Sequence, residues 1–328
     1  MLHYIIRRFF YMFGMLFLMS IVAFVVVQLP PGDYVTSYVT RLTEMGERVS
    51  DAEVAALTQL YGLDKPILFQ YVKWIGNMFR GNWGMSFQLN RPVIDLIAER
   101  LPLTLVVSIS TLLFTYIVAI FVGIYSATHQ YSFSDYAVSV VGFIGLATPN
   151  FLLALILMLV FNRAFGLSIG GLFSIEYQLA PWGPAKLWDM ITHLPIPIIV
   201  IGTAGTASII RVMRSCLLDE LRKQYVITAR AKGVVESTLL FRYPVRVAVN
   251  PIVSTVAWIL PAIFSGSTIT ATVLGLPTVG PMLLQSLTFQ DTYLSGAIIL
   301  LLCALTVIGT LLSDILLVVI DPRIKFEK

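Results

Sequence analysis

The chain has 328 residues, of which 57% are apolar and only 12% are charged, and its mean hydropathy is +0.85. Soluble domains carry about 25% charged residues, so this composition excludes the ordinary soluble classes and predicts an all-α membrane protein. The net charge of +4 comes without a basic stripe interleaved with aromatic residues, which excludes a nucleic-acid partner.

The sequence contains six apolar stretches near the length of about 20 residues that a membrane-spanning helix needs. They are 9–29, 101–128, 136–161, 196–212, 249–273 and 294–320. The fourth has the least certain ends, because Gly202 and Gly205 interrupt it. The first follows Arg7 and Arg8 as a signal peptide would, but its 21 residues exceed the usual signal core of about 7–15. We therefore expect a retained span.

The distribution of Lys and Arg predicts the orientation. Eight of the 22 cations lie between Arg211 and Arg246, two lie in 162–195, and none lies in 274–293. Short loops rich in Lys and Arg stay in the cytoplasm. The sequence therefore predicts a multi-pass membrane protein with cytoplasmic N- and C-termini. We expect a span at 8–29, an extracytoplasmic insertion at 30–100, a five-span core at 101–320 with a cytoplasmic loop at 213–248, and a cytoplasmic tail at 321–328.

The insertion at 30–100 is expected to form two short helices. The run from Ser50 to Glu53 has the spacing of a capping box and should open a helix that ends near Gly62. Pro66 suits the first turn of a second helix, which should reach about Arg80. The apolar stripe of that second helix, which includes Trp74, either lies on the outer membrane surface or packs against the spans of the protein.

Two apolar stretches contain residues that suit a translocation path. Pro149 should break the third stretch, and a broken helix inside a membrane is tolerated where it lines a cavity or is buried in protein. The fifth stretch is rich in hydroxyl groups and has no charge. Candidate path residues are Pro149, Asn150, Trp258, Ser265, Ser267, Thr268 and Thr270. The alternative is that they serve only helix packing.

The basic interval contains the run Thr228-Ala-Arg-Ala-Lys-Gly233, followed by Asn250-Pro251. Glycine permits a tight turn, so two short helices around Gly233 are expected. This run resembles the coupling loop of ABC importer permeases of the dipeptide, oligopeptide and nickel group. The resemblance implies a prokaryotic inner (plasma) membrane, the type I permease fold and a loop that docks onto an ATPase. The residues that would do so are Tyr225, Thr228, Ala229, Arg230, Ala231, Lys232, Gly233 and Val235.

A second and longer match to the same family runs from Gly62 to Leu105. It includes the pattern Gly-Leu-Asp at 62–64, Gln70-Tyr71, Trp74, and Glu99 to Leu105, with Asn82 where the family commonly has Asp. The resemblance implies that this region contributes to the docking surface for an extracytoplasmic binding protein. Asp64, Gln70, Trp74 and Arg80 are the candidate docking residues.

No motif in the sequence predicts catalysis. It has no phosphate-binding lysine loop, and its three His and two Cys are scattered. The resemblance implies that ATP and Mg²⁺ are bound by two separate ATPase subunits. A second, homologous permease subunit would complete the pore as a heterodimer, with membrane lipid around it. No cofactor is expected in this chain.

The substrate expected from the resemblance is a di- or oligopeptide. Residues 168–172 depart from the family pattern, and an acidic residue usual near Thr270 and Thr272 is absent, so an oligosaccharide stays an alternative. Nickel is disfavoured, because no cluster of His, Cys or carboxylate lines the spans. A secondary transporter is also disfavoured, because paired charges at mid-membrane depth are absent. Asp314 lies near the end of its apolar run, so its side chain can reach the membrane interface. We therefore expect Asp314 to have a structural role.

Overall fold

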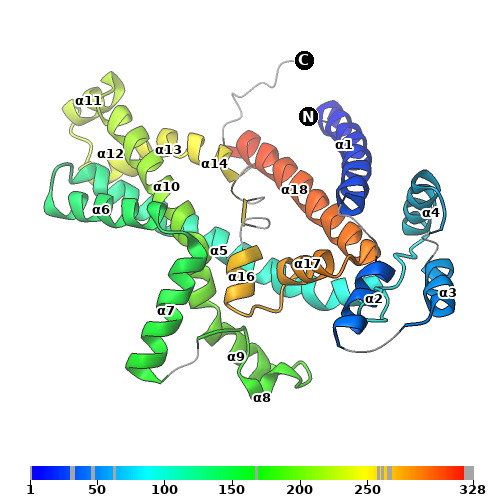
Figure 1. Ribbon diagram of the computed structural model, residues 1–328. Coiled ribbons are helices and arrows are strands. Elements are labelled where there is room, and N and C mark those ends of the chain that lie inside the picture. Colours follow the sequence, from blue (N-terminus) through cyan, green and yellow to red (C-terminus); the bar gives the residue numbers. More distant parts are fainter. Residues whose placement is uncertain are drawn as a thin grey trace. The chain divides into compact units, whose positions relative to one another are not determined.

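The computed structural model describes residues 2–29, 34–45, 49–61, 64–166, 169–256, 259, 262–263 and 268–320. These residues form helices and connecting turns (Figure 1), and their only bridge of β type joins Met85 to Pro92. The predicted cytoplasmic tail at 321–328 lies outside the described residues, as does the side chain of Asp314. The all-helical prediction is therefore confirmed for the described part of the chain.

The chain divides into two compact units. Unit 1 comprises Met1–Thr104 and Pro277–Val307, and unit 2 comprises Leu105–Leu276 and Ile308–Lys328. Two long helices pass from one unit into the other, α5 (Val93–Thr128) and α18 (Thr292–Ile320). The other helices of unit 1 are α1 (Leu2–Gln28), α2 (Tyr34–Glu44), α3 (Asp51–Tyr61), α4 (Ile67–Phe79) and α17 (Val279–Thr288).

The core of unit 1 is built by the first turns of α5, by α17 and by the first half of α18. Its buried apolar residues are Val93, Leu96, Ile97, Val279, Met282, Leu294, Ala297 and Ile298. Thr104 adds a polar link, because its Oγ1 accepts a hydrogen bond of 2.9 Å from the backbone N–H of Val279. That bond satisfies one of the backbone donors that the start of α17 leaves without a helical partner.

Helix α4 packs against α1 within unit 1. Phe24 of α1 contacts the rings of Tyr71 and Trp74, with ring centroids 5.4 Å and 5.7 Å apart. The hydroxyl groups of Ser20 and Tyr71 are 2.8 Å apart and share a hydrogen bond. Of the two environments expected for the apolar stripe, Tyr71 and Trp74 adopt the second, because they pack against a helix of the same chain. The predicted helices at 51–62 and 66–80 are confirmed as α3 and α4.

Unit 2 is organised around α10 (Pro195–Leu221), which packs against α6, α7, α13 and α14. Its other helices are α6 (Phe133–Ala147), α7 (Asn150–Phe165), α8 (Ile175–Gln178), α9 (Pro184–His193), α11 (Gln224–Ala231), α12 (Glu236–Arg242), α13 (Pro244–Ala248), α14 (Asn250–Ser254) and α16 (Thr268–Val273). Small residues let α10 approach its neighbours closely: a Cβ on Gly123 of α5 would lie 2.7 Å from the Cβ of Met213.

Four helical segments of the described chain are long and apolar enough to cross a membrane. They are Phe10–Gln28, Val93–Thr128, Pro184–Leu221 and Thr292–Ser313. The predicted second and fourth spans, at 101–128 and 196–212, lie within Val93–Thr128 and Pro184–Leu221, whose helices begin earlier in the chain. A fifth candidate is obtained if α6 and α7 count together as one span.

The predicted single span at 136–161 is bent. Helices α6 and α7 meet at Thr148 and Pro149 with an angle of 105° between them. Pro149 precedes α7 with φ −58° and ψ 135°, and its ring cannot follow the last turn of α6. The expected break at Pro149 is confirmed. The bend is sharper than we expected, because we predicted one span with a local interruption.

The predicted fifth span at 249–273 is not found as one unbroken helix in the described residues. The structure has α14 and α16 there, each of five or six residues. Pro251 stands in the first turn of α14, where a proline interrupts helix hydrogen bonding from the preceding α13. Residues 257–258, 260–261 and 264–267, between these two helices, lie outside the described residues, so the span at 249–273 stays a prediction.

Candidate functional site

The basic interval folds into a helical hairpin. Helices α11 and α12 are joined by a turn at Gly233, whose φ is +77°. This is the left-handed region that favours glycine. The buried side chains of Val226, Ala229 and Leu239 form a small apolar cluster between the two helices. The predicted helix–glycine–helix arrangement is therefore confirmed.

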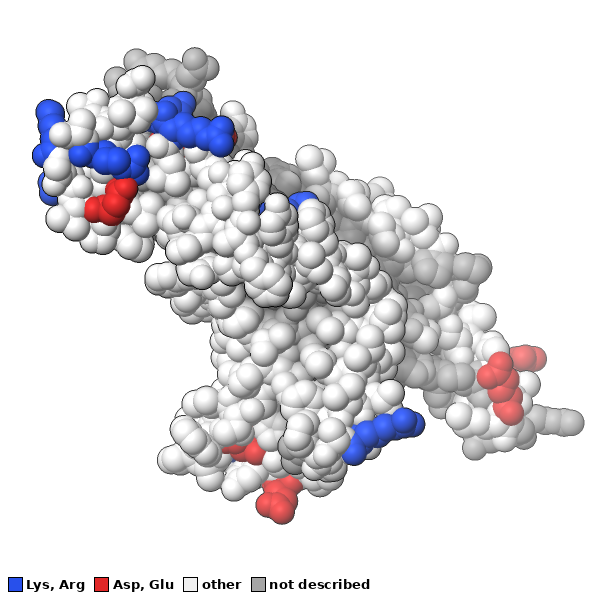
Figure 2. All heavy atoms as spheres, turned by 90° about the vertical axis from the view of Figure 1, so that its left-hand side faces the viewer, with Lys and Arg blue, Asp and Glu red and all other residues white. Residues whose placement is uncertain are grey.

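The outer surface of this hairpin carries both apolar and basic side chains. Ile227, Val235 and Phe241 are exposed. The exposed cations in the sequence around them are Arg222, Lys223, Arg230, Lys232, Arg242 and Arg246. Figure 2 shows Lys and Arg side chains gathered at the top of the view, at the height of α11 and α12 in Figure 1. Arg230 is paired with the exposed Glu236 at 2.8 Å, and the other cations give the surface an excess of positive charge. Apolar contact area together with this excess suits a partner groove with acidic edges.

Of the predicted coupling residues, all but one lie on the outside of the hairpin. Tyr225, Thr228, Arg230, Ala231, Lys232, Gly233 and Val235 are exposed, whereas Ala229 is buried under α12. Ala229 therefore supports the hairpin from within, because its small side chain lets the two helices approach.

Tyr225 ties the hairpin to the end of α10. Its hydroxyl donates a hydrogen bond of 2.5 Å to the carboxylate of Glu220. Burial and this neighbouring carboxylate both raise the pKa of Tyr225 above its ordinary value, so the phenol keeps its proton and the bond is present throughout the physiological pH range.

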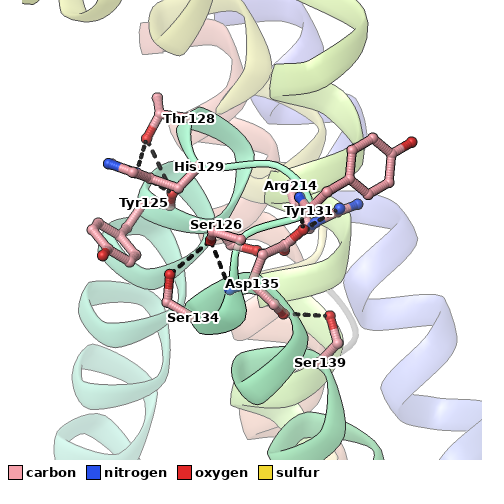
Figure 3. A network of polar contacts seen from close by, with 10 residues as sticks. Tyr125, Ser126, Thr128, His129, Tyr131, Ser134, Asp135, Ser139 and Arg214 are labelled. Atoms are coloured by element: carbon pink, nitrogen blue, oxygen red, sulfur yellow. Dashed lines mark hydrogen bonds and ion pairs between the residues drawn. The ribbon is translucent and has the colours of Figure 1, made fainter.

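A network of polar side chains holds α10 against the loop between α5 and α6 (Figure 3). Arg214 of α10 donates two hydrogen bonds of 2.7 Å to the two carboxylate oxygens of Asp135. Ser126 of α5 donates to the same carboxylate. The Asp135 side chain is 3% exposed and that of Arg214 is 27% exposed. A buried carboxylate with this many donors fixes the positions of three helices relative to one another.

Asp135 also shapes the loop that precedes α6. The backbone N–H of Tyr131 donates a 3.0 Å hydrogen bond to Asp135 Oδ2, and Tyr131 has φ +65°. A non-glycine residue in this region carries strain of about 1 kcal/mol or more. The carboxylate offsets that strain by accepting the N–H. Sequence analysis missed this site, since Asp135 and Arg214 are 79 positions apart.

A cavity of about 320 Å³ lies in unit 2 beside the corner between α6 and α7. Its polar lining comes from Thr115, Asn150 and Ser208, and none of its described lining residues is charged. The Asn150 amide donates a 3.3 Å hydrogen bond to the carbonyl of Ile201. Gly202 and Gly205 also line the cavity, where the lack of a side chain leaves room.

The structure brings one of the predicted path residues, Asn150, into this cavity. Pro149 forms the exposed corner, and Thr268 and Thr270 lie on α16 without lining the cavity. Trp258, Ser265 and Ser267 lie outside the described residues. Thr115 and Ser208 were missed, although the glycines near Ser208 were the available signal.

The predicted docking residues lie in unit 1. Asp64 and Arg80 are exposed and Gln70 is half-buried. Trp74 is only 3% exposed, so it does not belong to a surface. Its indole packs against Phe24, because the apolar stripe of α4 faces α1. The other three residues stay candidates for docking.

No group of three or more His, Cys, Asp or Glu side chains among the described residues could hold a metal ion. The chemistry of the described site is that of contact surfaces and an uncharged cavity.

Comparison with known proteins decides the family. Residues 119–326 match the model of the binding-protein-dependent transport system inner membrane component, and residues 1–109 match the N-terminal domain of the same group. The chain belongs to this family. It is therefore a non-catalytic membrane component of a transport system that depends on a binding protein.

Named relatives match this transport component over nearly its full length. An oligopeptide transport system permease protein of Bacillus subtilis is 34% identical over 325 residues, covering 98% of the chain and 99% of the relative. A di/tripeptide transport system permease protein of Pseudomonas aeruginosa is 30% identical and covers 100% of both. A glutathione transport system permease protein of Escherichia coli is also 30% identical with full coverage of both.

Proposed function

We propose that this transport component is a permease subunit of an ATP-driven importer of di- and oligopeptides. The observation that carries this proposal is the hairpin of α11 and α12, which offers exposed apolar side chains together with an excess of exposed cations. It has the form of a docking element for a separate ATPase subunit. The likeness to the peptide permeases over the whole chain supports the substrate class.

The proposed membrane arrangement has six spans with both termini and the hairpin in the cytoplasm. The excess of Lys and Arg in 211–246 supports this orientation. The complete transporter would contain a second homologous permease subunit, two ATPase subunits that bind ATP and Mg²⁺, and an extracytoplasmic binding protein. Asp64, Gln70 and Arg80 are proposed to contribute to the docking of that protein.

The uncharged cavity beside Asn150 suits a peptide importer. Peptides share their backbone and differ in side-chain charge, so a fixed charge on the path would favour some sequences and retain others. We propose that Asn150, Thr115 and Ser208 offer hydrogen bonds to the passing backbone. Selection of the substrate would then rest with the binding protein.

The test is ATP hydrolysis by the complete transporter reconstituted in lipid vesicles with its binding protein. Gly233→Trp forces a side chain into the left-handed turn at the centre of the hairpin surface. The matched control is Gly166→Trp, because Gly166 has φ +66° and, like Gly233, has no other atom within 4 Å of the position of a Cβ. Both variants therefore carry similar backbone strain, but Gly166 lies after α7 and away from the hairpin.

We expect di- and oligopeptides to stimulate ATP hydrolysis in the wild type and in Gly166→Trp. In Gly233→Trp, stimulation should be lost while the subunits still purify together. If an oligosaccharide stimulates hydrolysis and peptides do not, the substrate class is wrong. If both glycine variants behave alike, the hairpin is not the coupling element.

A further inference from the structure

Helix α9 has the opposite polarity to that of a helix on a water-exposed surface. Its charged and ionisable residues Lys186, Asp189 and His193 face inward, with Lys186 only 7% exposed. Its outward face carries Leu187, Trp188 and Ile191, and Trp188 is 68% exposed.

The inward polar groups are satisfied inside the segment 173–193. Lys186 Nζ donates hydrogen bonds of 2.6 Å to the carbonyl of Ala180 and 3.3 Å to that of Gln178. It also lies over the rings of Phe173 and Trp182, at 4.9 Å and 5.2 Å from their centroids. Cations over aromatic faces are stabilised best where water is excluded.

Asp189 completes the internal set. Its carboxylate accepts hydrogen bonds of 2.8 Å from the backbone N–H of Ser174 and 2.6 Å from the Ser174 hydroxyl. His193 Nδ1 lies 3.6 Å from the same carboxylate. Ser174, Lys186 and Asp189 therefore close the segment on itself. Large apolar residues are left on the outside, where Ile175 of α8 and Leu179 just after it are exposed beside the polar side chains of Glu176 and Gln178.

The exposed apolar face of α9 continues into the membrane-spanning helix α10. Exposed residues recur at helical spacing through Trp188, Ile191, Pro195 and Ile199. Helices α9 and α10 form a single candidate span, Pro184–Leu221, because Leu194 keeps helical angles between them. The surface of the segment is thus an extension of the surface that a span offers to lipid.

The spacing along this helix matches a bilayer. Trp188 precedes Arg211, the first charged residue of α10, by 23 positions, which corresponds to about 34 Å at about 1.5 Å per residue. The hydrocarbon core of a bilayer is about 30 Å thick. Tryptophan prefers the interface on either side, and Arg is enriched on the cytoplasmic side. If Arg211 lies at the cytoplasmic interface, Trp188 lies at the outer one.

We infer that the segment 173–193 is a membrane-interface element that rests in the outer leaflet, with Leu179, Trp182, Trp188 and Ile191 among the lipids. The ligand of this surface is phospholipid, at the boundary between headgroups and acyl chains. Contact of the exposed face with lipid explains the inversion of polarity. Acyl chains offer no hydrogen bonds, so Lys186 and Asp189 find their partners inside the segment. The inference rests on the finding that the chain belongs to a family of membrane components. It does not depend on which substrate is transported.

The test measures the solvent around spin labels in the complete transporter in phospholipid vesicles. Nitroxide labels are attached at Trp188→Cys and Leu179→Cys in a background with Cys216→Ser and Cys303→Ser. The control is Asp51→Cys at the exposed start of α3. Collisions with oxygen, which concentrates in lipid, are compared with collisions with a water-soluble nickel chelate. Labels at 179 and 188 should show several-fold more oxygen collisions and several-fold fewer nickel collisions than the label at 51.

Two other outcomes would overturn the inference. If the nickel chelate reaches positions 179 and 188 as readily as position 51, the segment lies in water. If neither oxygen nor nickel reaches them, another protein subunit covers the face. Leu179 protects the test against a folding defect, because its side chain is 99% exposed and its replacement removes almost no internal contact. These measurements need neither ATP nor peptide, so failure of the proposed transport function leaves them interpretable.

Discussion

The ion pair between Asp135 and Arg214 allows a quantitative prediction. Asp135→Asn keeps the size of the side chain but removes its charge, and it leaves the guanidinium of Arg214 without a counter-ion. Breaking a fully buried pair costs about 3–5 kcal/mol. Because Arg214 retains 27% of its side-chain exposure, water can partly replace the carboxylate. We therefore expect a loss of about 2–3 kcal/mol, which is about a hundredfold change in the folding equilibrium.

The matched control is the exposed ion pair of Arg91 and Glu99, whose side chains are 48% and 54% exposed. Exposed pairs contribute about 0–1 kcal/mol, so Glu99→Gln should change stability little. Both variants are unfolded by titrating dodecyl sulfate into mixed micelles of the purified chain, and helix content is followed by circular dichroism. Equal losses for Asp135→Asn and Glu99→Gln would refute the claim that burial gives the Asp135 pair its greater weight.

A double variant separates charge from packing. If the unpaired cation causes the loss, Arg214→Met added to Asp135→Asn should recover most of it, because an apolar side chain of similar length leaves no buried charge. A coupling energy near zero between the two substitutions would instead show that the side chains act independently.

Asp291 and Gly123 give further tests. Burial raises the pKa of the Asp291 carboxyl above its ordinary value, against the hydrogen bond from Ser86. Its stabilising contribution is therefore full below about pH 4 and is lost as pH rises through the raised pKa. As pH rises from about 4 through the raised pKa, the unfolding free energy of the wild type should fall relative to that of Asp291→Asn. A rise would contradict the upward shift of the Asp291 pKa. Gly123→Ala should cost about 1–3 kcal/mol by overpacking against Met213. Gly14→Ala, with no other atom within 4 Å, should not destabilise; equal thermal shifts for the two variants would argue against close packing of α5 and α10.

The features predicted from sequence are those with a local cause. Gly233 marks its turn because only glycine enters the left-handed region at little cost, and Pro149 marks its corner because its ring excludes the preceding helical turn. Composition alone predicted most of the spanning helices. Each of these signals can be observed within one stretch of residues.

The features that sequence reasoning missed depend on distant partners. The contact of Asp135 with Arg214 joins residues that no short pattern relates. The residues Lys186, Asp189 and His193 recur at helical spacing, and only their partners in the fold show that they face inward. The sequence places Trp74 on the apolar stripe of α4, but it does not show that this stripe packs against α1. The two helices are too far apart in the chain for a local pattern to relate them.

The two ends of the hairpin differ in mechanical stiffness. On one side α10 is a continuous helix of 27 residues, and the Tyr225–Glu220 bond attaches the hairpin to it. On the other side the chain is divided into helices of five residues, each opened by a proline, Pro244 and Pro251. A force applied to the hairpin would therefore move α10 as one rigid helix. On the other side, the chain would bend at the breaks before and between α13 and α14.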